Sequence, residues 1–468
     1  MKKASADLEE EISSIPLETQ GTIPRWLFGT LVRNGPVNVS INGEHLNHWF
    51  DGLAMLHAFS FEQGCVRYAN RFLRTDAYQT VFETGSIHYL GFANDPCRSL
   101  FKRLSTWLAP HTNHSLPNAN INVAQIAHEY VALTEIPLPV RFDPTTLQTL
   151  GVLEYQDHLP KEKCWESAHP HRLKKGTLNY LIQYGRKSDY ILYTVPDTLT
   201  ERRLIAQIPV DEPAYMHSFA MTENYVVFTE FPFVVKPLDL ITKGKPFIYN
   251  FSWKPERGTR FTVVNRFDGS LFGQYTTRPF FAFHHVNAFE AEDSLCLDIV
   301  TYPDPSIIQA VADYAQTPSQ EHAKPVTKLE RFTLSFKNHQ LVSEMLFESS
   351  VEFPRINSAY DGHPYRYVYL TDARDQALPQ EDVRPLYKLD TGTKQALTWA
   401  EKGCYPGEPI FVAAPEATRE DAGVILSVVL NPSKKSAFLL ILDASNFQEL
   451  GRAEAPHYIP PGLHGQFF

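Results

Sequence analysis

Four histidines stand in contexts that favour a metal site. Each lies near the end of an apolar or aromatic run, where strand or loop ends can converge: His169 in "WESAHPHRL", His217 in "PAYMHSFAM", His284 in "FAFHHVNAFE" and His464 in "PPGLHGQFF". Imidazole nitrogens suit zinc, copper, iron and nickel. The successive separations are 48, 67 and 180 residues, far too long for a local metal-binding loop. Only a closed fold that brings distant segments to one axis could assemble such a site.

Two of these contexts contain a second histidine. His284 is followed directly by His285, and neighbouring side chains on a strand point to opposite faces, so at most one of the pair can face a given interior point. His169 and His171 could instead form a His-x-His metal motif on one face of a strand. The residues alone leave both questions open.

Glutamates in apolar surroundings are the candidate partners of such a site. A metal held without thiolates or bound carboxylates keeps its charge uncompensated, so carboxylates that accept the second N–H of each ligand are expected nearby. Buried glutamates are rare unless they are paired. Three stand out: Glu135 in "VALTEIPL", Glu352 in "SSVEFPRIN" and Glu408 in "CYPGEPIFV". Taken singly, each could equally be an ordinary turn or edge-strand residue.

The elements that must position these residues are strands. Short apolar runs bounded by Pro, Gly, Asn and Asp recur along the chain, and "GVILSVVL" and "AFLLILDA" flank the turn-rich "NPSKKS" like a hairpin. This pattern predicts an all-β protein built as a sandwich, barrel or propeller. We find no fixed internal period and no composition shift that marks a linker, so we expect one domain over residues 1–468.

Composition and charge exclude several functions. The net charge of −10 argues against a general nucleic-acid binder. Five scattered cysteines without C-x-x-C spacing indicate free thiols in a reducing compartment. The beginning of the sequence has no apolar signal region and no window is apolar enough to span a membrane, so a cytoplasmic location is expected. Nucleophile-elbow, Walker, dinucleotide-binding and H-E-x-x-H motifs are absent.

One segment, 95–110, breaks the strand pattern with helical periodicity. Its apolar residues fall on one helix face, with the basic residues mostly elsewhere: Leu100, Phe101, Leu104, Trp107 and Leu108 against Arg98, Lys102 and Arg103. The segment predicts either an amphipathic helix packed on the body or an interfacial helix that dips its apolar face into a membrane.

At these residues the sequence resembles the carotenoid cleavage oxygenase family. The resemblance extends over nearly the whole chain, from "GTIPRWLFGTLVRNGP" and "HWFDGLAMLHAF" to the final "LHGQFF", and "FHHVNAFE" and "CYPGEPIFVAAPEATREDAGVILSVV" are most similar to the animal branch. It implies a seven-bladed β-propeller, capped by loops and helices that form a hydrophobic tunnel. It also implies an Fe(II) ion on the propeller axis, held by His169, His217, His284 and His464. Because the family keeps the first histidine of "FHHVN", His285 is not expected to be a ligand.

The resemblance assigns further roles around the metal. Glu135, Glu352 and Glu408 match carboxylates that orient three of the four imidazoles. Thr134 matches a threonine that limits access to an open coordination position. For the tunnel wall we expect Phe50, Tyr302 and Phe467.

The reaction implied by the resemblance is cleavage of one C=C bond of a carotenoid or apocarotenoid by O₂, with symmetric formation of retinal as the favoured version. Stilbene cleavage and retinyl-ester isomerohydrolysis are alternatives within the family, and a propeller that serves only as a binding scaffold is the non-enzymatic one. A lipophilic polyene, O₂ and peripheral membrane contact through segment 95–110 are the expected partners.

Overall fold

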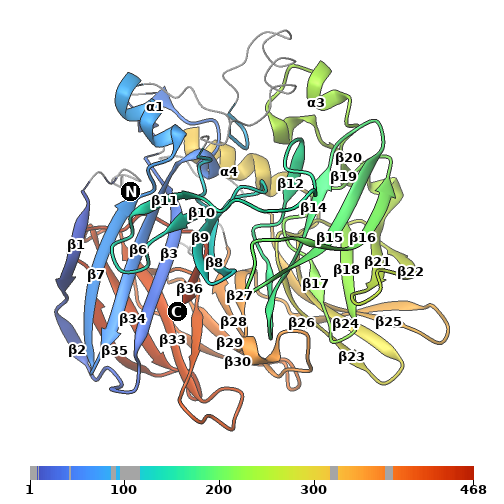
Figure 1. Cartoon of the computed structure of the whole chain (residues 1–468). Helices are drawn as coiled ribbons and strands as arrows, with labels where there is room; N and C mark the ends of the chain where they lie inside the picture. Colours follow the sequence, from blue (N-terminus) through green and yellow to red (C-terminus); the bar gives the residue numbers. More distant parts are fainter. Residues whose placement is uncertain are drawn as a thin grey trace.

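Short strands dominate the molecule and assemble into blades rather than into a sandwich or a barrel (Figure 1). The computed structural model describes residues 8, 10–38, 40–41, 44–85, 91–94, 116–316, 325–374 and 383–468. Within this part of the chain, seven antiparallel sheets of four to six strands stand around one axis. The all-β prediction and the propeller implied by the resemblance are therefore confirmed.

In blades 1 to 4 the strands follow one another from the axis outwards. Blade 1 contains β36 (Gly465–Phe467), β3 (Gly29–Val37), β6 (Leu53–Glu62), β7 (Cys65–Phe72) and β1 (Ile12–Pro16). Blade 2 contains β8 (Asn122–Ile126), β9 (Glu129–Leu133), β10 (Val140–Phe142) and β11 (Thr149–Val152). Blade 3 contains β12 (Cys164–Glu166) and β13 (His171–Leu173), which both pair with β14 (Gly176–Gln183), then β15 (Ser188–Pro196) and β16 (Arg203–Val210). Blade 4 contains β17 (Ala220–Met221), β18 (Tyr225–Glu230), β21 (Thr259–Asn265) and β22 (Leu271–Thr277).

In blades 5 to 7 the strands are again named from the axis outwards. Blade 5 contains β23 (His285–Ala291), β24 (Ser294–Thr301), β25 (Lys328–Ser335) and β26 (Leu341–Phe347). Blade 6 contains β27 (Val351–Arg355), β28 (Tyr367–Asp372), β29 (Leu386–Asp390) and β30 (Gln395–Trp399). Blade 7 contains β31 (Tyr405–Pro406) and β32 (Ile410–Ala413), which both pair with β33 (Gly423–Asn431), then β34 (Ser436–Asp443), β35 (Glu449–Glu454) and β2 (Thr19–Gly21).

Strands from both ends of the chain close the ring. The C-terminal β36 pairs with β3, with Gln466 opposite Val32, and becomes the innermost strand of blade 1. The N-terminal β2 pairs with β35, with Gln20 opposite Arg452, at the outer edge of blade 7. The C-terminal strand thus completes blade 1, and an N-terminal strand completes blade 7. Closure of the ring therefore requires residues 465–467.

Packing between blades explains the long apolar runs in the sequence. Strands β33 and β34 are buried at nearly every position, since both faces of a central strand are covered by neighbouring blades. Their hairpin forms as predicted, with Asn431 opposite Ser436. The outer strands β22 and β26 are instead largely exposed.

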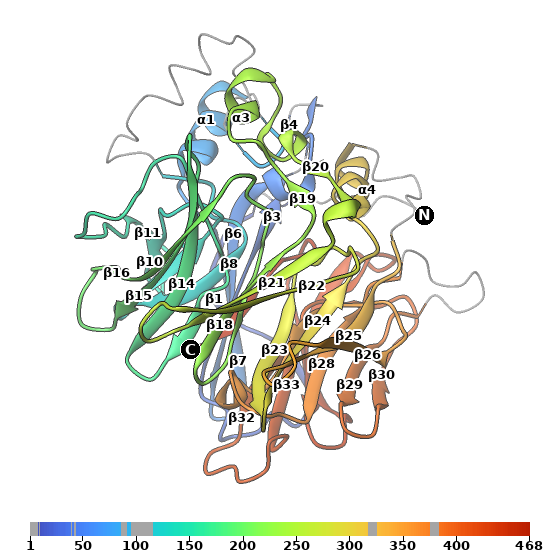
Figure 2. The ribbon, with the colours of Figure 1, turned by 90° about the vertical axis from the view of Figure 1, so that its right-hand side faces the viewer.

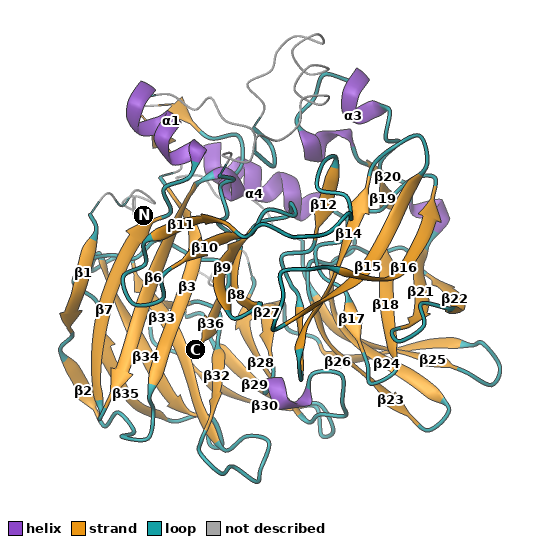
Figure 3. Ribbon diagram, in the orientation of Figure 1, coloured by secondary structure: helices purple, strands orange, loops and turns teal. Residues whose placement is uncertain are grey.

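Helices gather on one face of the propeller and form a cap (Figures 2 and 3). The cap includes α1 (Asp76–Thr84), α3 (Asp239–Thr242) and α4 (Ser306–Gln316). Helix α1 begins where the Thr75 side chain accepts a hydrogen bond from the Tyr78 amide, and it ends at Gly85 in the left-handed conformation, φ 66°.

The remaining short elements are 3₁₀ turns and two small hairpins: η1 (Trp49–Asp51), η2 (Phe247–Asn250), η3 (Pro255–Arg257), η4 (Ser358–Tyr360), β4 (Ser40–Ile41) with β5 (Glu44–His45), and β19 (Phe233–Val234) with β20 (Ser252–Trp253). Segment 95–110 lies outside the described residues. In the described part of the chain, no helix has the length and apolar character needed to cross a membrane.

Candidate metal centre

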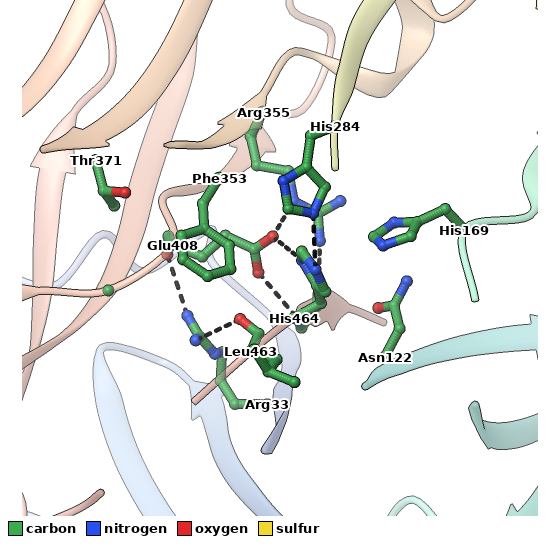
Figure 4. Close-up of polar contacts among 12 residues, drawn as sticks. Arg33, Asn122, His169, His284, Phe353, Arg355, Thr371, Glu408, Leu463 and His464 are labelled. Atoms are coloured by element: carbon green, nitrogen blue, oxygen red, sulfur yellow. Dashed lines mark hydrogen bonds and ion pairs between the residues drawn. The ribbon is translucent and has the colours of Figure 1, made fainter. Parts of the chain in front are cut away.

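The four histidines singled out in the sequence converge on the propeller axis. His284 directly precedes β23, His464 directly precedes β36, His217 lies just before β17, and His169 lies between β12 and β13. Each therefore comes from the innermost part of a different blade. One ring nitrogen from each lies within 4.8 Å of those of the other three. Figure 4 shows His169, His284 and His464 from this group.

Hydrogen bonds decide which ring nitrogens face the centre. The Nδ1–H of His217 donates to Glu135 at 2.5 Å, that of His284 to Glu352 at 2.6 Å and that of His464 to Glu408 at 2.8 Å. In a neutral imidazole the other nitrogen, Nε2, then carries a lone pair.

The four Nε2 atoms meet at short range, and in His217, His284 and His464 this atom carries the lone pair. The Nε2 atoms of His284 and His464 are 3.2 Å apart, and those of His169 and His217 are 2.9 Å apart. Lone pairs gathered in this way repel one another unless a cation lies between them. The donor set of four imidazoles therefore fits a transition-metal ion.

All seven blades contribute to this arrangement. The histidines come from blades 1, 3, 4 and 5, whereas Glu135, Glu352 and Glu408 come from blades 2, 6 and 7. Glu135 follows β9, Glu352 lies in β27, and Glu408 lies between β31 and β32. All three carboxylates are at most 7% exposed. Among the described residues, His169 has no carboxylate on its second nitrogen.

Further hydrogen bonds hold each carboxylate. Tyr215 donates its phenol proton to Glu135 at 3.0 Å, and Tyr302 donates to Glu352 at 2.7 Å. Glu408 instead accepts from the Arg355 guanidinium at 2.8 Å and from the Gly465 amide. Sequence reasoning missed Tyr215 and Arg355, and it placed Tyr302 only on the tunnel wall. The available signal was their position, since Tyr215 lies just before His217 and Arg355 just after Glu352 in the sequence.

The electrostatics of the carboxylates differ accordingly. Burial raises the pKa of Glu135 well above its usual value, and the hydrogen bond from Tyr215 only partly offsets this. Burial also opposes ionisation of Glu352, but the neighbouring His284 lowers its pKa overall. For Glu408, burial is outweighed by the Arg355 charge and by His464, which together hold its pKa well below the usual range.

Three of the four candidate ligands are kept in the neutral, metal-binding form. Burial lowers the pKa of His464 to about 4 despite the adjacent Glu408. Burial and the neighbouring imidazoles lower the pKa values of His169 and His217 well below 6.5.

Two arginines fix the C-terminal segment that carries His464 (Figure 4). Arg33 donates to the Leu463 carbonyl at 2.9 Å and to the Glu408 carbonyl at 3.2 Å. Arg355 donates to the Gly465 carbonyl at 2.6 Å. The last strand is thus anchored at the backbone on both sides of His464.

His285 points away from the centre, as expected from strand geometry. Its Nδ1 contacts the Ser218 hydroxyl at 2.8 Å and its Nε2 the Thr229 hydroxyl at 2.7 Å. Both ring nitrogens are occupied inside blade 4, so neither is left for the group around the axis.

The alternative His-x-His motif is wrong. His171 Nδ1 pairs with Asp361 at 2.8 Å, and its Nε2 bonds the Phe219 carbonyl at 3.1 Å. No ring nitrogen of His171 is left for a metal, and His171 is not part of the group around His169.

A cavity of about 540 Å³ reaches the histidines between propeller and cap. Its wall includes His217, His284, His464, Glu135, Glu352 and Thr134. Phe50 and Tyr302 line it as expected. Phe467 does not: its ring packs on Phe61 with centroids 6.0 Å apart, in the apolar cluster between blades 1 and 7. The expectation failed because Phe467 is a residue of β36, where its ring faces the space between blades rather than the cavity. Sequence reasoning missed Ile121, Phe283 and Trp165 on the wall.

Replacing Glu352 with Gln should lower metal affinity about 10- to 100-fold. The amide keeps the shape of the side chain but removes the charge that the His284 N–H faces. Titration of the metal-free protein with Co²⁺, followed by absorption, measures this. Glu344→Gln, at an exposed position on β26, should leave the affinity unchanged; equal affinities in all three proteins would contradict the role of Glu352.

Comparison with known proteins gives one consistent answer. The family model described as retinal pigment epithelial membrane protein matches residues 4–468. The β,β-carotene 15,15′-dioxygenase of Gallus gallus is 32% identical over 517 residues, covering 98% of this chain and 96% of that protein. The carotenoid isomerooxygenase of Galleria mellonella is 34% identical over 499 residues, covering 98% of this chain and 94% of that protein.

Solved structures agree with the sequence comparisons. The cobalt-substituted oxygenase of Synechocystis superposes with a TM-score of 0.84 at 26% identity, covering 99% of this chain and 97% of that one. A single-residue variant of Synechocystis apocarotenoid oxygenase gives a TM-score of 0.85 at 26% identity with the same coverage.

Proposed function

The chain belongs to the retinal pigment epithelial membrane protein family of carotenoid oxygenases, and we propose that its four histidines hold Fe(II) and that it cleaves one C=C bond of a carotenoid or apocarotenoid. One O₂ is consumed, and each of its atoms ends in one of two carbonyl products. The observation that carries this proposal is the convergence of four imidazoles, three of which line an apolar cavity.

The donor set supports iron in particular. Zinc binds imidazole well but has no redox chemistry, whereas a dioxygenase must pass electrons to O₂. Iron accepts imidazole ligands, and the carboxylates of Glu352 and Glu408 supply negative charge one hydrogen bond away from the ligands. Bound iron would supply the activation of O₂ at this site.

The residues of the chain orient the imidazoles and provide an apolar surface for the polyene. Glu135, Glu352 and Glu408 hold three imidazoles in one tautomer. Phe50, Phe283 and Tyr302 form an apolar wall beside the histidines, and a polyene lying against it would displace water. The double bond that rests beside the metal is the one cleaved, so the contacts along the wall select the bond. We propose that residues 1–468 act as one domain in this reaction.

Reconstitution tests the proposal directly. Protein loaded anaerobically with Fe(II) and then given O₂ with β-carotene, an apocarotenal or resveratrol should convert a polyene into two carbonyl compounds, identified by mass. The two products should together contain all the carbon atoms of the substrate and both atoms of O₂. Cleavage of resveratrol alone would favour a stilbene oxygenase. Isomerisation and hydrolysis of a retinyl ester without O₂ uptake would favour an isomerohydrolase, and failure to bind iron would favour a scaffold.

We also propose that the cap contacts a membrane, where lipophilic polyenes reside. Two observations support this: the helical periodicity of segment 95–110, and the exposed apolar side chains of Phe82 on α1 and Leu238 beside α3, which are 53% and 67% exposed on the cap. Such residues partition favourably into an interface.

Replacing Phe101 and Trp107 together with Ser should reduce co-sedimentation with phospholipid vesicles while leaving iron content unchanged. Phe267→Ser removes a ring that is 68% exposed outside the cap, between β21 and β22, and should have no effect. Vesicle binding that is unaltered by the double replacement would rule out this role of the segment.

A further inference from the structure

His48 is a buried histidine that lies outside the metal centre. It begins the block "HWFDGLAMLHAF" and directly precedes the turn η1. The residue is 0% exposed. Within the described part of the chain it belongs neither to the group of four histidines nor to the cavity wall. A buried imidazole placed in this way acts through the groups that it bonds.

Both ring nitrogens of His48 are bonded to the backbone. The Nε2 atom lies 3.1 Å from the carbonyl oxygen of Ile308 in α4, and the Nδ1 atom lies 3.1 Å from the amide nitrogen of Phe50 in η1. Because a carbonyl only accepts and an amide N–H only donates, the proton of the neutral ring must be on Nε2. Burial favours the neutral ring and lowers the pKa of His48 to about 3. His48 is therefore a fixed link between η1 and the cap helix α4.

The two elements that His48 joins both line the cavity. Helix α4 lies in the cap (Figure 3) and contributes Ile307 and Val311, which are four positions apart and so share one helix face. The turn η1 contributes Phe50 and Asp51. The bond from His48 to α4 spans 260 positions of the sequence. It thus fixes two remote parts of the wall relative to each other.

Phe50 connects this link to the surroundings of the metal centre. Its ring lies edge-on to the Phe283 ring with centroids 6.2 Å apart, and the Phe283 ring lies edge-on to His217 at 5.6 Å. Asn120 Nδ2 donates to the Phe50 carbonyl at 2.7 Å. The backbone of Phe50 is therefore held at its amide by His48 and at its carbonyl by Asn120.

The His48 ring also supports the cavity wall by packing. Its centroid lies 4.6 Å from that of the Phe50 ring and 5.0 Å from that of the Phe92 ring, and both of these rings line the cavity. The Phe92 amide in turn donates to the Asp51 carboxylate at 2.6 Å. Loss of the imidazole would remove two hydrogen bonds and a packing surface outside the cavity, while every side chain on the wall would remain.

We propose that His48 is a positioning residue: by holding Phe50 and helix α4 at a fixed separation, it sets where a polyene comes to rest and so which double bond lies beside the metal centre. The inference rests on the proposed function, because it concerns the choice of the bond that is cleaved. Double bonds repeat along a polyene, so neighbouring registers differ mainly in how the chain fits the wall. A shift of Phe50 relative to α4 therefore admits a neighbouring register.

Cleavage of an apocarotenal tests this, because its chain is unsymmetrical and each double bond gives a different pair of product masses. In iron-loaded His48→Ala, the ratio of neighbouring-bond products to the main products should rise about 10-fold, as expected when a buried hydrogen bond that favours one register is lost. The iron content should equal that of the wild type, since His48 is not in the group of four. His45→Ala is the matched control, an exposed histidine three positions earlier, and should keep the wild-type ratio.

Two conservative replacements separate the two bonds of His48. An asparagine amide oxygen lies near the position of Nδ1 but the side chain is too short to reach Ile308, whereas a glutamine amide nitrogen reaches the position of Nε2. Hydrogen–deuterium exchange reads these bonds without turnover. His48→Asn should raise exchange in α4 several-fold and shift the product ratio as His48→Ala does. His48→Gln should raise exchange in η1, keep α4 near the wild type and restore much of the wild-type product ratio.

An unchanged product ratio in folded, iron-loaded His48→Ala would overturn the inference, as would an equal shift in His45→Ala. If His48→Ala does not fold, the ratio in His48→Asn decides in the same way. Raised exchange of α4 in a protein whose wild type cleaves no polyene under O₂ would support the link through His48 and overturn the proposed function. Unchanged exchange of α4 in every His48 variant would overturn the link itself.

Discussion

His284→Ala should retain less than about a tenth of the iron bound by the wild-type protein, whereas His285→Ala should retain most of it. The Nε2 of His284 lies 3.2 Å from that of His464 and belongs to the group of four. Its removal leaves three imidazoles and a Glu352 carboxylate that has lost its imidazole partner. The ring of His285 instead bonds two hydroxyl groups of blade 4. Iron content after anaerobic loading and desalting measures the difference.

Thermal unfolding separates the two roles further. His285→Ala leaves the Thr229 hydroxyl and one contact of Ser218 unpartnered in a buried site, so it should cost about 1–3 kcal/mol of unfolding free energy. His158→Ala, at an exposed position, should change neither the iron content nor the free energy of unfolding. If both members of the pair lost iron equally, the choice of His284 as the ligand would be wrong.

Deleting residues 464–468 should abolish iron binding and also destabilise the propeller. The deletion removes His464 together with β36, the innermost strand of blade 1. It removes the Phe467 ring from its contact with Phe61 and the Gly465 carbonyl from Arg355. Phe467 is partly buried against the cluster between blades 1 and 7, so the loss of its ring adds to the loss of the strand. A markedly lower Tm and absence of iron are the expected results.

His464→Ala separates these two effects. This variant keeps β36 and its pairing with β3, so it should lose iron and yet unfold at a temperature near that of the metal-free wild type. Gln466→Ala, in the middle of β36, should keep both iron and stability because its backbone pairing is unchanged. A truncated protein that still bound iron would exclude His464 as a ligand.

The candidate ligands could be read from the sequence because each histidine ends an apolar run that becomes the inner part of a blade. The same reasoning identified Glu352 and Glu408, whose apolar surroundings predict burial. It could not show which glutamate bonds which histidine. Of the four histidines, His169 is the nearest to Glu135 in the sequence. The Glu135 carboxylate nevertheless bonds His217 of blade 4. That pairing depends on how blades 2, 3 and 4 meet at the axis.

Residues that act through others were harder to find. Arg33 and Arg355 are far apart in the chain, and each contacts backbone carbonyls that no side-chain pattern reveals. Phe467 was misplaced because proximity to His464 in sequence does not say which face of β36 a ring occupies.

By itself the sequence determined the all-β architecture, through the short apolar runs and turn residues, and it identified the histidines and glutamates that make up the candidate centre. Those features are local, because burial and strand formation depend on the pattern of neighbouring residues. Only the tertiary structure decided which carboxylate orients which imidazole, which ring nitrogens face the centre, and where the cavity leads. Each of these is set by distances between blades, and a linear pattern carries no information about distances between segments hundreds of residues apart.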